Sequence, residues 1–174
     1  MFICQLNLTS APARPSHLED LQLVTFFVVN TDDQLDREDS SNWIVRTYQS
    51  LDGLAPLAVP AGAPKMRKGF ECLWEELDDH PNYDDPELVP VPGTRRPRSN
   101  FDNVIRTKVG GYASTIQSEL WWDLHGHPAN PKFCLQINSE EKPGVVWTGG
   151  GTVYIGRGRE PGYENRWYLD YQCL

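Results

Sequence analysis

The 174-residue chain contains no hydrophobic run that approaches the ~20 residues of a membrane-spanning helix. Met1 leads directly into a strand-like run, without the basic and long apolar regions of a signal peptide, so we expect a cytoplasmic protein. The four cysteines form no Cys-x-x-Cys pair, which argues against structural zinc and favours free thiols. Basic residues are also few, since 16 of them against 24 acidic residues give a net charge of −8. Such a surface repels the phosphate of DNA and RNA, so we expect no nucleic-acid partner. Because no long apolar run occurs, we expect no membrane partner either.

Motifs of common enzyme classes are missing as well. No Lys-Ser/Thr pair follows the triple glycine Gly149–Gly151, and no Gly-x-Ser-x-Gly elbow occurs. His125 and His127 form the only close histidine pair and could bind zinc with Asp123, but the intervening Gly and the following Pro indicate an ordinary loop. We therefore predict no catalytic residue, no metal and no cofactor. The alternative is an uncharacterised enzyme or ligand-binding domain with a site near His125, His127 and Trp147–Gly151.

Alternating apolar residues predict β-strands at both ends of the chain. In Lys132–Asn138 the apolar Phe, Leu and Ile alternate with Cys, Gln and Asn, which is the two-residue period of a half-buried strand. A turn with Pro and Gly follows, and Thr152–Ile155 is a second β-favouring run. The chain begins with a similar strand, because Ile3–Asn7 and Cys134–Asn138 both read apolar, apolar, Gln, apolar, Asn.

The similarity continues beyond this first pair of strands. Leu21–Val29 follows in the first copy where Thr152–Ile155 follows in the second, and Trp43–Ser50 then corresponds to Trp167–Cys173. Three matched strands in the same order indicate an internal duplication. We predict a β-rich α+β fold with few short helices. It would contain two similar three-stranded antiparallel units.

Chain length and composition indicate a single domain over residues 1–174. Its halves would be residues 1–50 and 108–174, joined over residues 51–107 by a proline-rich link and an acidic segment. Within the joining region, Phe70–Leu77 alternates like a strand, with a short helix as the rival interpretation. A further short helix is predicted over Thr115–Trp122.

Several short motifs resemble those of the YwqG-like family of uncharacterised bacterial proteins. These motifs are Lys108–Tyr112, Ile116-Gln117, Leu135–Ser139, Trp147–Tyr154 and the opening Cys4–Asn7. The chain departs from the family at Thr148-Gly149, where the family tends to Gly-Asp, and at Ala113, where it tends to Pro. No reaction is attached to this family, so the resemblance implies no catalytic residue. Some of its members lie beside secreted bacterial toxins and resemble immunity proteins, which implies a toxin as partner.

Acidic residues are concentrated in one run, with eight of the 24 between Glu71 and Glu87. A solvated loop is one interpretation of this acidic run. The other is a surface for a basic toxin, of which a nuclease effector is one candidate. The residues that we expect to contact such a partner are Glu75, Glu76, Asp78, Asp79, Tyr83, Asp84, Asp85 and Glu87. Trp74 and Tyr83 are candidate aromatic anchors, with core packing as the alternative role, above all for Trp74. The sequence thus favours a protein-binding module that neutralises a cognate toxin.

Overall fold

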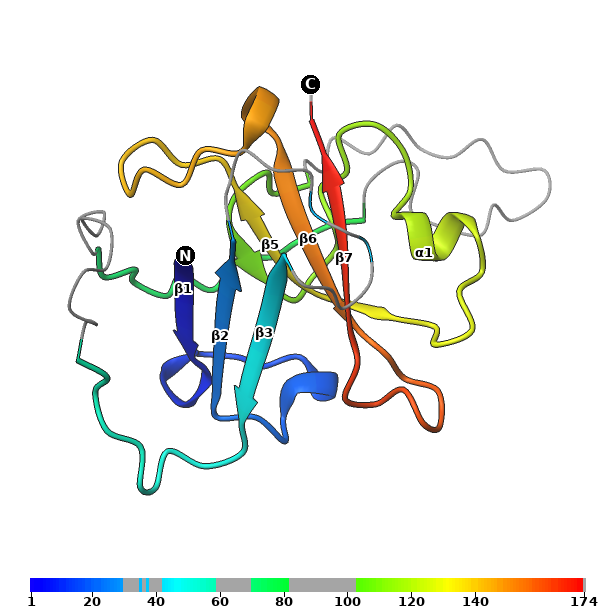
Figure 1. Cartoon of the computed structure of the whole chain (residues 1–174). Helices are drawn as coiled ribbons and strands as arrows, with labels where there is room; N and C mark the ends of the chain where they lie inside the picture. Colours follow the sequence, from blue (N-terminus) through cyan, green and yellow to red (C-terminus); the bar gives the residue numbers. More distant parts are fainter. Residues whose placement is uncertain (30–34, 36, 38–41, 59–69, 82–102, 174) are drawn as a thin grey trace.

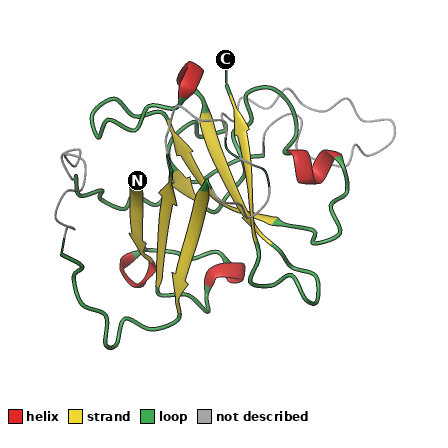
Figure 2. Ribbon diagram, in the orientation of Figure 1, coloured by secondary structure: helices red, strands yellow, loops and turns green. Residues whose placement is uncertain are grey.

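Two antiparallel β-sheets dominate the computed structural model of the chain (Figures 1 and 2). It describes residues 1–29, 35, 37, 42–58, 70–81 and 103–173. The first sheet has the order β1-β2-β3 and the second the order β4-β5-β6-β7. The β-rich fold with few short helices that the sequence predicts is therefore confirmed. None of the helices in the described part of the chain combines the length and the hydropathy needed to span a membrane.

The first sheet is a simple meander built from the N-terminal strands. β1 (Phe2–Asn7) pairs with β2 (Leu23–Val28), which pairs in turn with β3 (Trp43–Tyr48). Val24, Phe26 and Val28 alternate along β2 and are all buried, as expected for a strand with one face against the core.

The second sheet contains the C-terminal strands. β5 (Lys132–Asn138), β6 (Thr152–Arg157) and β7 (Trp167–Gln172) again form a meander. β4 (Lys108–Val109) adds a fourth strand by pairing with β5. The two units, which the sequence predicts to have three strands each, therefore differ: the first sheet has three strands and the second has four.

The pairing of the two meanders is similar in detail. Gln5 lies opposite Thr25 in the first sheet, and Gln136 lies opposite Tyr154 in the second. Both first strands contain a register irregularity, between Phe2 and Cys4 in β1 and between Phe133 and Leu135 in β5. The two third strands both begin with Trp, opposite the last residue of the preceding strand.

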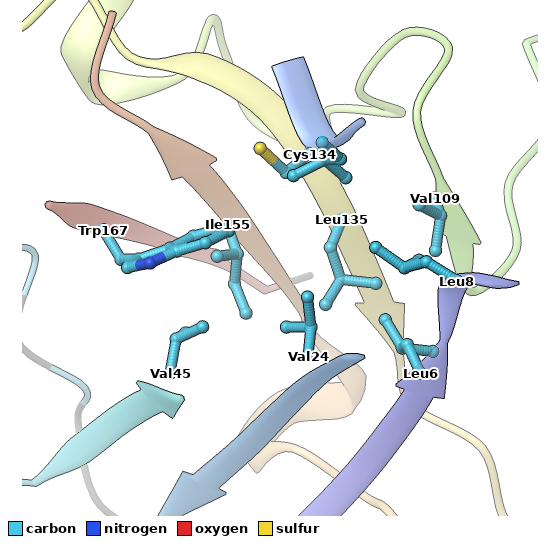
Figure 3. Close-up of a pocket in the computed structure, with 10 residues that line it drawn as sticks. Leu6, Leu8, Val24, Val45, Val109, Cys134, Leu135, Ile155 and Trp167 are labelled. Carbon is cyan, nitrogen blue, oxygen red and sulfur yellow. The ribbon is translucent and has the colours of Figure 1, made fainter. Parts of the chain in front are cut away.

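The two sheets pack face to face around the main core. This core contains buried residues from both sheets, among them Val24 and Phe26 of β2, Leu135 of β5 and Ile155 of β6. Figure 3 shows side chains of the first sheet pointing toward those of the second. Burial of so many apolar side chains is the main stabilising contribution, at about 1.5–3 kcal/mol for each large one.

The opposite face of the second sheet is covered by the segment before β5. A second cluster joins Leu120 and Trp122 of this segment to Phe133, Tyr154 and Tyr168 of the strands. The outer face of the first sheet differs, because Gln5 and Arg46 are exposed there.

Short helices account for the rest of the regular structure among the described residues. They are η1 (Leu8–Ser10), η2 (Ser16–Leu18), α1 (Trp121–Leu124) and η3 (Thr148–Gly150). The helix predicted over Thr115–Trp122 is thus mostly wrong. Residues 116–119 form a bend instead, and Gln172 Oε1 accepts the N–H groups of Ile116 and Gln117 at 2.8 and 3.1 Å. The strand predicted over Phe70–Leu77 is also wrong, since this stretch has neither helix nor strand pairing.

Candidate functional site

An exposed stretch of chain passes beside the first sheet and contains the described part of the acidic run. We call its residues Glu71–Asp78 the open segment. All eight residues are exposed, and neither a turn nor a bend interrupts them. Leu73 is 91% exposed and Leu77 is 45% exposed. The open segment therefore presents apolar and acidic side chains together.

Side-chain contacts attach the open segment to the body of the protein. Trp74 Nε1 donates to Ser10 Oγ at 3.1 Å, just after β1. Glu75 forms an ion pair with Arg106 at 3.2 Å, but both side chains are about two-thirds exposed, so solvent screens the pair. Trp74 itself remains 37% exposed, which leaves part of the indole available as a contact surface. Glu76 and Asp78 are exposed as well.

Asp79 differs from its acidic neighbours, because its carboxylate points into the protein. Lys108 Nζ donates to Oδ2 at 2.8 Å, and both side chains of this pair are only 11–12% exposed. The backbone N–H of Tyr112 donates to Oδ2 at 2.9 Å, and that of Val104 donates to Oδ1 at 3.1 Å. Asp79 thus fixes the end of the open segment to the second sheet.

The electrostatics of this pair reflect both burial and hydrogen bonding. Burial alone would raise the pKa of Asp79, but the hydrogen bonds from Lys108 and the two N–H groups outweigh it and lower this pKa. Burial also lowers the pKa of Lys108, although the carboxylate opposes the change. Gly111 completes the site, since a Cβ there would lie 2.3 Å from Asp79 Oδ2. The arrangement is a structural clamp.

The remaining predicted contact residues, Tyr83, Asp84, Asp85 and Glu87, lie outside the described residues. Their role as contacts stays a prediction. Of the predicted set, the structure leaves Glu75, Glu76 and Asp78 exposed and turns the carboxylate of Asp79 into the protein. Sequence reasoning missed Leu73 and Leu77 as surface residues, although both lie in the stretch Phe70–Leu77 that the strand-like pattern marks.

One glutamine of the repeated motif, Gln136, holds loops against the second sheet. Gln136 is fully buried, and its Oε1 accepts the N–H of Ser114 at 2.8 Å. Its Nε2 donates to the carbonyl of Arg106 at 3.0 Å and to Asn138 Oδ1 at 2.8 Å. The hydroxyl of Tyr154 donates to the carbonyl of Ser114 at 2.7 Å. The motif residue Gln136 and the neighbouring Tyr154 therefore have a structural role, which is to hold the loops that contain Arg106 and Ser114.

The alternative site near the histidines and the triple glycine is divided in space. α1, which precedes the histidines, and η3, which contains the glycines, lie on different sides of the molecule (Figure 1). His125 is exposed, whereas His127 Nδ1 accepts the N–H of Ala129 at 3.1 Å. Among the described residues, no group of three or more His, Cys, Asp or Glu side chains could hold a metal ion.

The triple glycine forms a packed turn. Gly149 and Gly150 have φ of 66° and 67°, a region that disfavours other residues. A Cβ on Gly151 would lie 2.5 Å from the carbonyl oxygen of Gln172. The indole of the preceding Trp147 is buried and donates to the carbonyl of Ile137 at 2.9 Å. The backbone angles and the close contact at Gly151 are enough to explain the glycines of this turn.

The interior contains a small apolar cavity between the sheets (Figure 3). Its volume is about 10 Å³, and its walls include Leu6, Val24, Leu135 and Ile155. A space of this size and polarity is too small for a substrate and offers no hydrogen-bond partner to a water molecule. Burial raises the pKa of the nearby Cys134 thiol to about 12, which makes it a poor nucleophile.

No family model, no curated protein and no solved structure is significantly similar to this chain.

Proposed function

We propose that this chain is a protein-binding module, an immunity protein that neutralises a cognate secreted toxin by direct contact. The observation that carries the proposal is the open segment, where the 91% exposed Leu73 lies among acidic side chains. A single exposed leucine has no consequence, but here Leu73 and Leu77 are both exposed within a few residues of the partly exposed Trp74, and such a gathering of exposed apolar side chains is typical of contact surfaces. The acidic residues would speed the encounter, and Leu73, Leu77 and Trp74 would supply the buried contact area.

The net charge of −8 supports a basic partner. A nuclease toxin fits this requirement, because its substrate groove must be positive to bind phosphate. Such an immunity protein acts where the toxin would otherwise do damage, so the proposal includes a cytoplasmic location. The YwqG-like resemblance of the motifs in both halves agrees with this function.

Reversing charge in the open segment should slow association with the toxin. We expect Glu76→Lys combined with Asp78→Lys to lower the association rate about tenfold at low salt, because electrostatic steering is lost. The toxin to use is one encoded beside the gene for this chain, and surface plasmon resonance at several salt concentrations measures the rate. Asp79 is left unchanged, because its carboxylate holds the fold together.

The matched control reverses two exposed acidic residues elsewhere, Asp52→Lys and Glu141→Lys, which changes the net charge equally. This control should lower the rate much less than the open-segment variant. Equal rates for the two variants would show that only net charge matters and would place the interface elsewhere. If the chain protected cells from none of the toxins encoded beside its gene, the immunity function itself would be contradicted.

We also propose that the two meanders arose by internal duplication. Their common strand order, the irregularity at corresponding points of β1 and β5 and the Trp at the start of β3 and β7 support this origin. In an experimental structure, the three strands of the first sheet should superpose on β5, β6 and β7 with Gln5 on Gln136 and Trp43 on Trp167. A best superposition that needs a different strand order or a shifted register would contradict the duplication.

A further inference from the structure

We infer that the open segment is an unpaired β-edge that binds an extended, basic segment of the partner as an added strand. The inference rests on the proposed function for the identity of the partner as a toxin, and it goes further by naming how the partner is held. It requires available backbone groups, suitable side chains and a fixed position.

The backbone of the open segment is available for pairing. No backbone hydrogen bond joins Glu71–Asp78 to the rest of the described chain, and the segment runs without helix, turn or bend. It contains no proline, so every residue carries an N–H donor as well as a carbonyl. Such a row of open donors and acceptors can template an incoming strand, which is the mode called β-augmentation.

The side chains specify the chemistry of the incoming strand. Leu73 and Leu77 are separated by Glu75 at a spacing of two, so in an extended chain the three project toward the same side. Glu71, Glu76 and Asp78 add further negative charge along the segment. The complementary strand has apolar residues that contact the leucines and Lys or Arg side chains that face the carboxylates.

Charge also decides against a second copy of this chain as the occupant. Pairing two open segments would place acidic side chains opposite acidic side chains, which destabilises a β-pair. A basic partner replaces this repulsion by attraction, so the segment is protected against self-association while it remains open to the toxin.

The open segment is held in position before the partner arrives. The bond between Trp74 and Ser10 fixes its middle, and the clamp around Asp79 fixes its end. A segment that is already attached at two points loses less conformational entropy on binding than a loose loop.

The test uses a peptide probe of about nine residues that repeats Lys-Lys-Val-Val, so that Lys and Val alternate along each face of the strand, and its length matches the open segment. Its control carries the same side chains but has alternate backbone nitrogens methylated, which removes donors from one edge. We expect the unmodified peptide to bind about tenfold more tightly than the methylated one by isothermal titration. Amide hydrogen exchange should slow in Glu71–Asp78 when the unmodified peptide binds.

A pair of leucine variants provides the matched control. Leu73→Ser should weaken peptide binding about tenfold, because apolar contact is lost. Leu57→Ser removes a leucine that is 90% exposed outside the open segment and should leave the affinity unchanged. Equal binding of the two peptides would reduce the interaction to charge and overturn strand addition, as would absence of binding up to about 1 mM.

These outcomes are separate from those of the immunity proposal. Strand addition with no protection from any neighbouring toxin would leave the inference standing and remove the proposed function. If the chain protected cells from a toxin but amide hydrogen exchange in Glu71–Asp78 did not change in the toxin complex, the proposed function would stand and strand addition would be overturned.

Discussion

Replacing Gln136 by Leu should lower the free energy of unfolding by about 3 kcal/mol. The side chain is fully buried, and it is the hydrogen-bond partner of the Ser114 N–H and of the Arg106 carbonyl. Leucine fills a similar volume but leaves these groups without their partner, and each unsatisfied buried group costs about 1–3 kcal/mol. The loop that the glutamine holds on the outer face of the second sheet should loosen as well. Urea denaturation followed by tryptophan fluorescence measures the change.

The duplicated pattern provides the control for this variant. Gln5 occupies the corresponding register position in the first sheet, opposite Thr25, but it is exposed. Gln5→Leu should therefore change the free energy of unfolding by less than about 0.5 kcal/mol. Similar losses in the two variants would mean that the glutamine stabilises the strand pair itself. A negligible loss in Gln136→Leu would contradict the structural role of the motif.

Gln5 and Gln136 occupy the same place in the sequence pattern, but only Gln136 is buried. This difference shows which part of the fold the sequence could predict and which part it could not. Each meander pairs strands that follow one another in the sequence, and the alternating apolar residues that mark each strand are a local feature. The covering of the second sheet is not local, because it depends on Gln136 and Gln172 binding loop backbone from distant parts of the chain. β4 contains only Lys108 and Val109, which is too short for any periodic pattern.

The same limit applies to the candidate site. An acidic run is visible in composition, but composition cannot separate the clamping carboxylate of Asp79 from the exposed one of Asp78 beside it. The difference arises from Lys108, 29 positions further along the chain. In the same way, Phe70, Cys72 and Trp74 at every second position predict an extended strand, but they do not reveal that no strand among the described residues pairs with it.

Replacing Asp79 by Ala should lower the free energy of unfolding by about 3 kcal/mol, a loss similar to that of Gln136→Leu. The substitution leaves the largely buried ammonium of Lys108 without its carboxylate and removes the acceptor for the N–H groups of Val104 and Tyr112. Asp78→Ala is the matched control, because this neighbour is exposed, and its effect should stay within about 0.5 kcal/mol. The double variant Asp79→Ala, Lys108→Met should be more stable than Asp79→Ala alone, since it no longer contains an uncompensated charge.

The dependence of stability on pH provides a second measure of this clamp. Because the pKa of Asp79 is lower in the folded protein than in the unfolded chain, the ionised carboxylate favours folding. This contribution is fully present above the unfolded pKa of about 3.9 and is lost as the pH falls through the lower folded pKa. The stability difference between wild type and Asp79→Ala, measured by urea denaturation, should therefore shrink below about pH 4. A difference that stayed constant across this range would show that the carboxylate acts through packing alone, and equal stability of the Asp78 and Asp79 variants would remove the clamp altogether.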